Sequence, residues 1–237
     1  MSAGSGRIIR TIIAQENCRR CRMAAGMRRH GRCTRRQGSQ PERVRCDRAL
    51  LSGAVCFQVP AGEEETFLKK HCSALTALCS RRLREEELAG MGTTAVCALV
   101  RGGKVFLCHA GDSRAYLYRD GRLAQLTHDH SYVQELVDCG TITVEEAEHH
   151  PQKNIITKAL GVDYRLDSEF TTAPLQKGDI LLLCSDGLTN AVPREQLEQL
   201  LRTGGFYDLP DLLIRTANEN GGPDNITALL LCVEEVR

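Results

Sequence analysis

No stretch of the 237-residue sequence approaches the roughly 20 consecutive apolar residues that a membrane-spanning helix needs. The N-terminus also lacks an apolar core followed by a small-residue cleavage site, as a secretory signal would have. We therefore expect a cytoplasmic protein without membrane association. Lysine is absent from the first 48 residues, which carry thirteen arginines and only three acidic residues. The net charge of +1 conceals this asymmetry, because the remainder of the chain is correspondingly acidic.

The chain has the length of one large domain and enough apolar residues for a core. Twelve cysteines would suggest a disulfide framework only in a small secreted domain. Four of them stand inside apolar runs, namely Cys97, Cys108, Cys184 and Cys232. We expect these four to be buried and to act as small hydrophobic residues.

Sustained hydrophobic periodicity begins only after residue 61. The expected elements are a helix over 66–88, a meander of strands over 93–100, 105–110 and 115–118, helices over 131–139 and from 144, a strand over 179–185, helices over 193–202 and 209–220, and a strand over 226–233. The two short helices, the second opened by a capping box of Thr143 and Glu146, are expected to cover a sheet face. This order predicts an α+β fold, an αββα sandwich of two antiparallel sheets flanked by helices.

The chain is accordingly divided into two parts. Residues 1–61 form an aberrant segment rich in arginine and cysteine, which we expect to be incomplete or poorly ordered. Residues 62–237 form the domain proper. No internal repeat is present in either part.

Carboxylates stand at the ends of three predicted strands. These motifs are Ser185-Asp186-Gly187 after the apolar run 181–184, Asp224-Asn225 before the closing strand, and Gly111-Asp112 after the strand 105–110. A carboxylate held on rigid backbone is the type of oxygen ligand that Mg²⁺ or Mn²⁺ selects. Each motif alone has an ordinary alternative, because Asp-Gly is a common turn, Asp and Asn bond to nearby backbone, and Asp112 could pair with Arg114.

Four motifs occur in a particular order along the chain. They are Met91-Gly92-Thr93-Thr94, Gly111-Asp112-Ser113-Arg114, Cys184-Ser185-Asp186-Gly187 and Gly222-Pro223-Asp224-Asn225. In order and spacing they resemble the metal-dependent serine/threonine protein phosphatases, the PPM type or protein phosphatase 2C. The segments 126–131 and 154–161 resemble the bacterial branch of that family. The resemblance runs from about Glu64 to Val236.

The resemblance implies the αββα sandwich and the hydrolysis of phosphothreonine and phosphoserine in proteins. In the family, two or three Mn²⁺ or Mg²⁺ ions bind the water that attacks phosphorus, so no side chain of this sequence is assigned as the attacking group. The implied partners are phosphorylated proteins and an opposing serine/threonine kinase. We expect no nucleic-acid partner and a monomeric protein.

The resemblance also assigns individual residues by their place in the motifs. Asp186 and Asp224 are the implied metal ligands, and Asp112 joins Asp186 at a third, more weakly held ion. Residues implied to shape the site are Gly187, Ser185, Asn225 and Gly111. His130 and Ser131 are implied to belong to a mobile flap that influences substrate access.

Two motifs that the family requires near the N-terminus are missing. One is an arginine before Asn-Gln-Asp or Asn-Glu-Asp, which binds substrate phosphate; Gln15-Glu16-Asn17 resembles its tail, but Cys18 replaces the acid. The other is Asp-Gly-Met-Gly-Gly, whose aspartate bridges both metals. Two unit charges about 4 Å apart interact by roughly 4 kcal/mol at an effective dielectric constant of 20, and two divalent ions repel about four times as strongly. We therefore expect little hydrolysis, and a pseudophosphatase that only binds phosphoproteins is an alternative.

Arginine-rich, lysine-free sequence with scattered cysteines is typical of GC-rich DNA translated out of frame. Residues 28–32, Arg-Arg-His-Gly-Arg, can be encoded as CGA CGG CAT GGG CGG. A shift of one base turns this into the codons for Asp-Gly-Met-Gly-Gly. Our hypothesis is that residues from about Cys18 to about Ala61 are a shifted-frame product and that the native frame is restored before Glu64.

A competing interpretation treats the N-terminal segment as a binding module. Its cysteines Cys18, Cys21, Cys33 and Cys46 could bind zinc, and its arginines could neutralise nucleic-acid phosphates. The cysteine spacing fits no common zinc finger, and aromatic stacking residues are nearly absent. This interpretation predicts stoichiometric zinc and salt-sensitive binding to RNA or DNA, whereas the phosphatase interpretation predicts neither.

Overall fold

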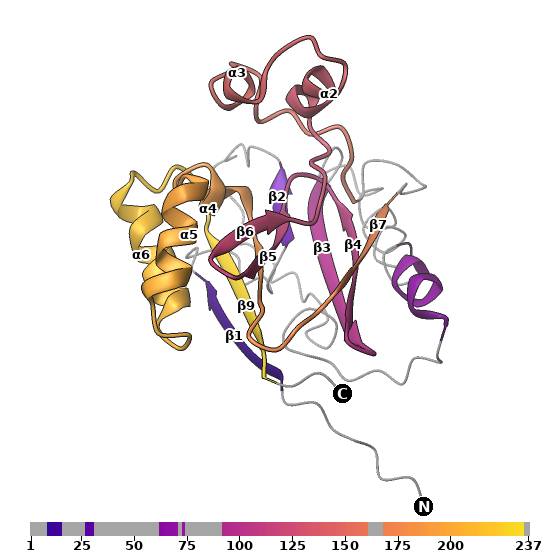
Figure 1. Ribbon diagram of the computed structural model, residues 1–237. Coiled ribbons are helices and arrows are strands. Elements are labelled where there is room, and N and C mark those ends of the chain that lie inside the picture. Colours follow the sequence, from indigo (N-terminus) through magenta and orange to yellow (C-terminus); the bar gives the residue numbers. More distant parts are fainter. Residues whose placement is uncertain are drawn as a thin grey trace, which may run out of the picture.

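Two antiparallel sheets pack face to face in the computed structural model of the protein (Figure 1), which describes residues 9–15, 27–30, 62–70, 73, 92–160 and 168–234. The five-stranded sheet has the order β1 (Ile9–Gln15), β9 (Thr227–Val233), β8 (Ile180–Cys184), β5 (Arg114–Arg119) and β6 (Arg122–Gln125). The four-stranded sheet has the order β2 (Met27–His30), β3 (Gly92–Arg101), β4 (Lys104–Ala110) and β7 (Glu169–Pro174). Every neighbouring pair of these strands is antiparallel.

Helical segments cover the outer faces of both sheets. On the five-stranded sheet lie α5 (Arg194–Thr203) and α6 (Leu209–Glu219), and α6 contacts β1 and β9. On the four-stranded sheet, the helical residues 64–70 place Leu68 in one cluster with Cys108 and Phe170. The short helix α4 (Asp186–Thr189) directly follows β8. The predicted αββα sandwich is confirmed.

Strand β8 is apolar along its length because both of its faces are covered. Leu181 and Leu183 pack between the sheets in one cluster with Leu107 of β4. Leu182 and Cys184 belong to the other large cluster, which lies under α5 and α6. Successive side chains of a strand point to opposite faces. One continuous apolar run in the sequence therefore supplies two cores.

Two of the four cysteines that we expected to be buried are completely so. Cys108 and Cys184 are both 0% exposed, whereas Cys97 and Cys232 are partly exposed. Burial raises the pKa of the Cys184 thiol to about 12, so this thiol stays protonated near neutral pH. The prediction is confirmed for Cys108 and Cys184 and only in part for the other two, which lie on less completely covered strand faces.

The predicted meander is wrong where the chain leaves β4. The hairpins β3–β4 and β5–β6 are present, but β4 and β5 belong to different sheets. The chain crosses between the sheets at residues 111–113, where Gly111 has a φ of +103°. A left-handed φ is readily available only to glycine, so the predicted strand break at Asp112 is a crossover rather than a turn within one sheet. Strands β6 and β7 and helix α4 were not among the elements predicted from the sequence.

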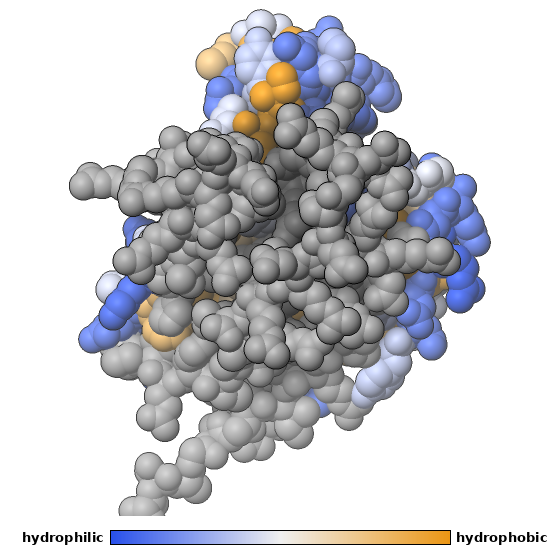
Figure 2. Space-filling model, turned by 180° about the vertical axis from the view of Figure 1, so that it is seen from behind, coloured by the Kyte–Doolittle hydropathy of each residue, from blue (hydrophilic) through white to orange (hydrophobic). Residues whose placement is uncertain are grey.

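Two helices project from the sandwich instead of covering a sheet, contrary to our expectation (Figure 1). They are α2 (Tyr132–Asp138) and α3 (Val144–Glu148), and α3 buries none of its side chains. Its capping box is present as predicted, since Glu146 N donates to Thr143 Oγ1 at 3.2 Å and Thr143 N donates to Glu146 Oε2 at 2.8 Å. Hydrophobic and hydrophilic residues mix on this projecting part, which we call the flap (residues 131–157) (Figure 2). Val144 and Ile155 are its most exposed large apolar residues.

The segment 1–61, which shows no strand periodicity in sequence, contributes two strands by backbone pairing. Ile9 of β1 lies opposite Val233 of β9, and His30 of β2 lies opposite Gly92 of β3. The remainder of this segment lies outside the described residues, as does most of the helix expected over 66–88. Among the described helices, none combines the length and the hydrophobicity needed to cross a bilayer.

The packing of α5 predicts different costs for two leucines on that helix. Leu197→Ala should lower the free energy of unfolding by about 2–5 kcal/mol, because this side chain is 1% exposed in the core. Leu200→Ala should cost clearly less, because that side chain is only partly buried. Urea unfolding monitored by circular dichroism measures both. Equal losses would show that α5 presents a different face to the sheet.

Candidate metal centre

The pairing of three neighbouring strands brings the predicted carboxylates to one edge of the five-stranded sheet. Arg114 of β5 lies opposite Cys184 of β8, which lies opposite Ala228 of β9. Asp112 stands two residues before Arg114, and Asp186 stands two residues after Cys184. The segment that carries Asp224 enters β9 at the same edge. Antiparallel pairing therefore collects three aspartates from segments far apart in sequence.

Ser185 ties the end of β8 to the start of β9. Its backbone N–H donates to Thr227 O at 3.1 Å, and Thr227 N donates to Ser185 Oγ at 3.0 Å. The same hydroxyl donates to Asn225 O at 3.1 Å. The Asp224-Asn225 segment is thus held beside Asp186. These bonds place Ser185 and Asn225 at the junction of the two segments, and their role in shaping a metal site stays a prediction.

Gly187 allows the two segments to come closer than any other residue would. A Cβ atom at this position would lie 2.4 Å from Asn225 O, a distance that real Cβ atoms do not reach. Asp186 begins α4, is 6% exposed, and accepts a hydrogen bond from Asn190 Nδ2 at 3.2 Å. Asp224 is partly exposed, and its Oδ1 accepts from Asn225 N at 2.7 Å. The site therefore has a buried carboxylate beside one that solvent can reach.

Asp112 lies in the crossover between the sheets and is 6% exposed. A Cβ atom on Gly111 would lie 2.2 Å from Thr94 Cγ2, so this position too depends on glycine. Thr94 Oγ1 and Ser113 Oγ are hydrogen-bonded at 2.9 Å. The motif at the start of β3 and the motif after β4 are therefore in direct contact, although Thr94 and Ser113 are 19 positions apart in sequence.

Arg114 pairs with Asp129, a partner that the sequence analysis did not identify. Arg114 Nε lies 2.9 Å from each oxygen of Asp129, and Arg114 Nη2 lies 2.6 Å from Asp129 Oδ2. Burial opposes the charge on Arg114, but the carboxylate of Asp129 keeps the pKa of the guanidinium above its ordinary value. Gln125 Nε2 also donates to Asp129 Oδ1, at 3.0 Å. This two-point pairing fixes the start of β5.

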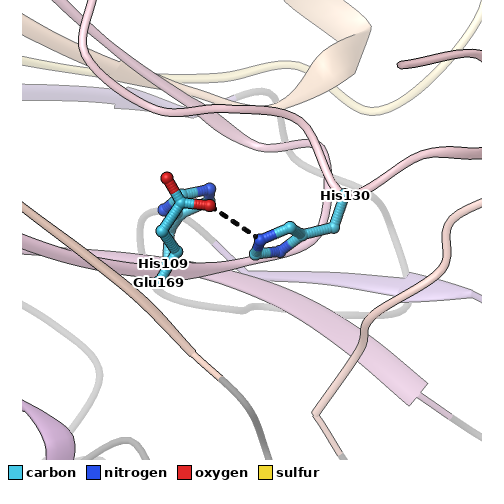
Figure 3. Close-up of side chains that lie close together, drawn as sticks. All are labelled: His109, His130 and Glu169. Atoms are coloured by element: carbon cyan, nitrogen blue, oxygen red, sulfur yellow. Dashed lines mark hydrogen bonds and ion pairs between the residues drawn. The ribbon is translucent and has the colours of Figure 1, made fainter. Parts of the chain in front are cut away.

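His109, His130 and Glu169 form a second cluster of polar side chains (Figure 3). Within the described part of the chain, they are the one group of three or more residues whose candidate ligand atoms all lie within 4.8 Å of one another. His109 Nε2 lies 2.7 Å from His128 O, and His130 Nε2 lies 3.3 Å from Glu169 Oε2. The two imidazole rings stack with centroids 4.7 Å apart and planes 3° from parallel.

This stacking argues against a metal ion bound by both histidines. An imidazole binds a metal along a nitrogen lone pair, in the plane of its ring, and two stacked parallel rings share no such plane. His130 Nδ1 also accepts the Gly111 N–H at 3.1 Å, so His130 Nε2 carries the proton of the neutral ring. A metal-bound histidine normally donates a hydrogen bond from its other nitrogen, whereas His130 accepts one there. We assign this cluster to hydrogen bonding, not to metal binding.

His130 and Ser131 lie at the base of the flap rather than on its projecting part. They are 6% and 3% exposed. Ser131 is the N-cap of α2, where its Oγ accepts from Gln134 N at 3.3 Å, and it pairs with Ile156 on the returning chain. Contact between these side chains and a protein substrate would require the base to open. Any influence on substrate access must therefore act through the position of the flap.

Several features of the sequence analysis lie outside the described residues. These are the four cysteines of the competing zinc interpretation and the Gln15-Glu16-Asn17 motif beyond the backbone of Gln15. Of the residues that can be recoded as Asp-Gly-Met-Gly-Gly, the structure describes the backbone of 28–30 in β2. Asp129, Glu169 and the contact of Thr94 with Ser113 were not identified from the sequence, because each depends on a partner distant in sequence.

A family model and sequence relatives of this chain all belong to the serine/threonine protein phosphatases. The family model described as protein phosphatase 2C matches residues 32–230, and so begins before the first motif of the sequence analysis. The serine/threonine phosphatase stp of Listeria welshimeri is 43% identical over 173 residues, which cover 72% of this chain and 69% of the relative. Serine/threonine protein phosphatase PstP of Mycobacterium tuberculosis is 41% identical over 155 residues, which cover 65% of this chain and 30% of the relative.

Solved structures agree with these sequence relatives. The serine/threonine phosphatase Stp1 from Staphylococcus aureus superposes with a TM-score of 0.72 at 38% identity, covering 76% of this chain and 71% of its own. The catalytic domain of PstP in complex with two manganese ions superposes with a TM-score of 0.68 at 36% identity, covering 75% of this chain and 74% of its own. That domain binds metal, and it has the same arrangement of sheets and helices.

The close approach at Gly187 predicts a large effect of a single methyl group. Gly187→Ala should lower the free energy of unfolding by about 1–3 kcal/mol and weaken Mn²⁺ binding, because the new Cβ forces Asn225 away from α4. Gly205→Ala is the matched control, since its Cβ would meet only the flexible Asp208 side chain, at 3.0 Å. Thermal unfolding and calorimetric Mn²⁺ titration measure both effects. Unchanged stability and binding in Gly187→Ala would contradict the packing described for this site.

Proposed function

Because the chain belongs to the protein phosphatase 2C family of metal-dependent serine/threonine phosphatases, we propose that it hydrolyses phosphoserine and phosphothreonine in proteins. The observation that carries this proposal is the junction of Ser185 and Gly187 with Asn225, which holds the backbone segments of Asp186 and Asp224 against each other. Phosphorylated proteins are the substrates and a serine/threonine kinase is the opposing enzyme in this proposal. The proposal also places the protein in the cytoplasm as a monomer.

The three aspartates would hold the divalent cations. All are oxygen donors, which suit Mn²⁺ and Mg²⁺, and the missing Cβ of Gly187 lets the Asp224-Asn225 backbone pack against the start of α4. Asp186 and Asp224 would bind the principal ions, and Asp112 would join Asp186 at a further one. When bound, the ions supply hydroxide near neutral pH and neutralise charge on the phosphoryl oxygens. Burial of Asp112 and Asp186 keeps bulk water from competing for two of the three ligands.

The backbone of β2 supports the reading-frame hypothesis for the missing bridging aspartate. In the shifted frame, the Asp codon falls at position 28, which lies opposite Thr94 in β3. Thr94 contacts Ser113, the neighbour of Asp112. A carboxylate at position 28 would therefore belong to a strand that borders the proposed metal centre. In the sequence as given, position 28 of that strand is Arg28, which has a positive charge in place of the carboxylate.

The metal ligand assignment predicts the loss of activity in one variant. Asp186→Asn should reduce Mn²⁺-dependent hydrolysis of a phosphothreonine peptide by at least about 100-fold, because the buried charge that binds the ions is removed. Asp211→Asn, on the exposed face of α6, should leave it unchanged. Turnover is measured with and without excess chelator. Activity that survives the chelator would rule out the metal-dependent mechanism. If the wild-type protein and Asp186→Asn bind the phosphopeptide equally and neither hydrolyses it, the protein is a pseudophosphatase.

The reading-frame hypothesis predicts what the encoding DNA contains. Sequencing across codons 15–65 should reveal compensating one-base changes that restore Asp-Gly-Met-Gly-Gly. The restored protein should then hydrolyse the phosphothreonine peptide much faster than the chain as written, because a bridging carboxylate offsets the repulsion between two divalent ions. If the frame stands as given, the missing aspartate is real and this hypothesis is wrong.

A further inference from the structure

The segment before the flap lies along the motif that carries Asp112 and is bonded to residues 111, 114 and 115. Ala115 N donates to Thr127 Oγ1 at 3.0 Å, and Leu126 N donates to Ala115 O at 2.7 Å. Asp129 holds Arg114 through its guanidinium. We call residues 126–130 the strap, because their bonds run along residues 111–115. Asp112 lies within the stretch that the strap holds.

His130 makes the last contact of the strap, with the peptide groups on both sides of the Gly111 Cα. Gly111 N donates to His130 Nδ1 at 3.1 Å, and His130 N donates to Gly111 O at 3.0 Å. Gly111 is the residue with a φ of +103° that directs the chain from one sheet to the other. Its neighbour Asp112 takes its direction from this peptide. The strap is therefore bonded to the crossover at Gly111, the residue immediately before the proposed metal ligand Asp112.

Three surrounding groups hold the His130 ring in the tautomer that this bond requires. Its Nδ1 accepts from a backbone N–H, so its Nε2 carries the proton and donates to Glu169 Oε2. The stacked ring of His109 covers one face of the His130 ring, and His109 Nε2 donates to His128 O within the strap. Burial, together with His109 and Lys158, lowers the pKa of His130, which favours the neutral ring.

We propose that His130 is a positioning residue for Asp112, and that its Nδ1 acceptor fixes the Gly111 peptide in the orientation from which Asp112 binds a divalent cation. The role is separate from catalysis, because the imidazole contacts the backbone beside the ligand and needs no contact with substrate. Through His130, the strap would orient the backbone next to Asp112. The proposal rests on the metal-dependent function proposed above.

Two substitutions separate the Nδ1 acceptor from the rest of the ring. Asparagine can place its side-chain oxygen near the position of Nδ1, whereas glutamine can place its amide near the position of Nε2. His130→Asn should therefore keep the bond from Gly111, and His130→Gln should lose it. His150→Gln is the matched control, because His150 Nδ1 also accepts a backbone N–H, from Gln152 at 3.1 Å, but within the flap.

The first readout is amide hydrogen exchange at Gly111, measured by NMR in the full chain. Exchange should be faster in His130→Gln than in the wild-type protein, and close to the wild-type rate in His130→Asn and His150→Gln. The second readout is Mn²⁺ titration, in which His130→Gln should weaken the ion that depends on Asp112 by about 10-fold or more, the range found for groups that orient metal ligands. Asp112→Asn defines which binding step is affected.

The outcomes distinguish this proposal from the proposed function. Equal Gly111 exchange in the Asn and Gln variants would overturn the positioning role, even if the wild-type protein is an active phosphatase. A wild-type protein that binds no Mn²⁺ would overturn the metal-dependent function and with it the ligand role of Asp112. If His130→Gln does not fold, the ¹⁵N spectrum of the wild-type histidines decides, because a protonated His130 Nδ1 would refute the assigned bond.

Discussion

The antiparallel pairing of β8 with both β5 and β9 aligns the ends of three strands at the edge of the five-stranded sheet. It sets Cys184 opposite Arg114 and Ala228, and the loops at this edge then carry the acidic residues. A slip of one residue would turn every side chain of β8 to the other face, taking Leu182 out of the core beneath the helices and Asp186 out of the site. The hydrophobic core and the candidate metal centre are thus specified by the same register, and neither can change alone.

Much of the sandwich could be predicted because its central strands and covering helices have strong local patterns. The doubly buried β8 is a continuous apolar run, and the amphipathic helices α5 and α6 have their expected bounds to within a residue or two. Strand β7 was missed because only one of its residues, Ala173, is fully buried, which leaves no run and little alternation. The assignment of β4 and β5 to different sheets could not be predicted, since a glycine at a strand break does not reveal which sheet the next strand joins.

In the candidate site too, residues within a local sequence pattern could be predicted, whereas contacts between residues far apart in sequence could not. The places of Asp186 and Gly187 could be predicted, because a buried strand that ends in Asp-Gly carries its own signal. The pairing of Arg114 with Asp129 and the contact of Gly111 with His130 span 15 and 19 residues and have no local pattern. In sequence, these histidine and aspartate residues look like ordinary loop residues. Only the folded chain shows that they hold the ligand motif in place.

The flap leaves and rejoins the sandwich at one point. Tyr132 N donates to Ile155 O at 2.9 Å, and Thr157 N donates to His130 O at 2.9 Å, so its two ends are joined by backbone bonds. The segment between them is an insert whose length and sequence can vary at little cost, since closing a longer loop adds only about 0.6 kcal/mol per doubling. The flap can therefore be replaced by a segment of another length or sequence. Substitutions within it leave the pairing of β5, β8 and β9 untouched.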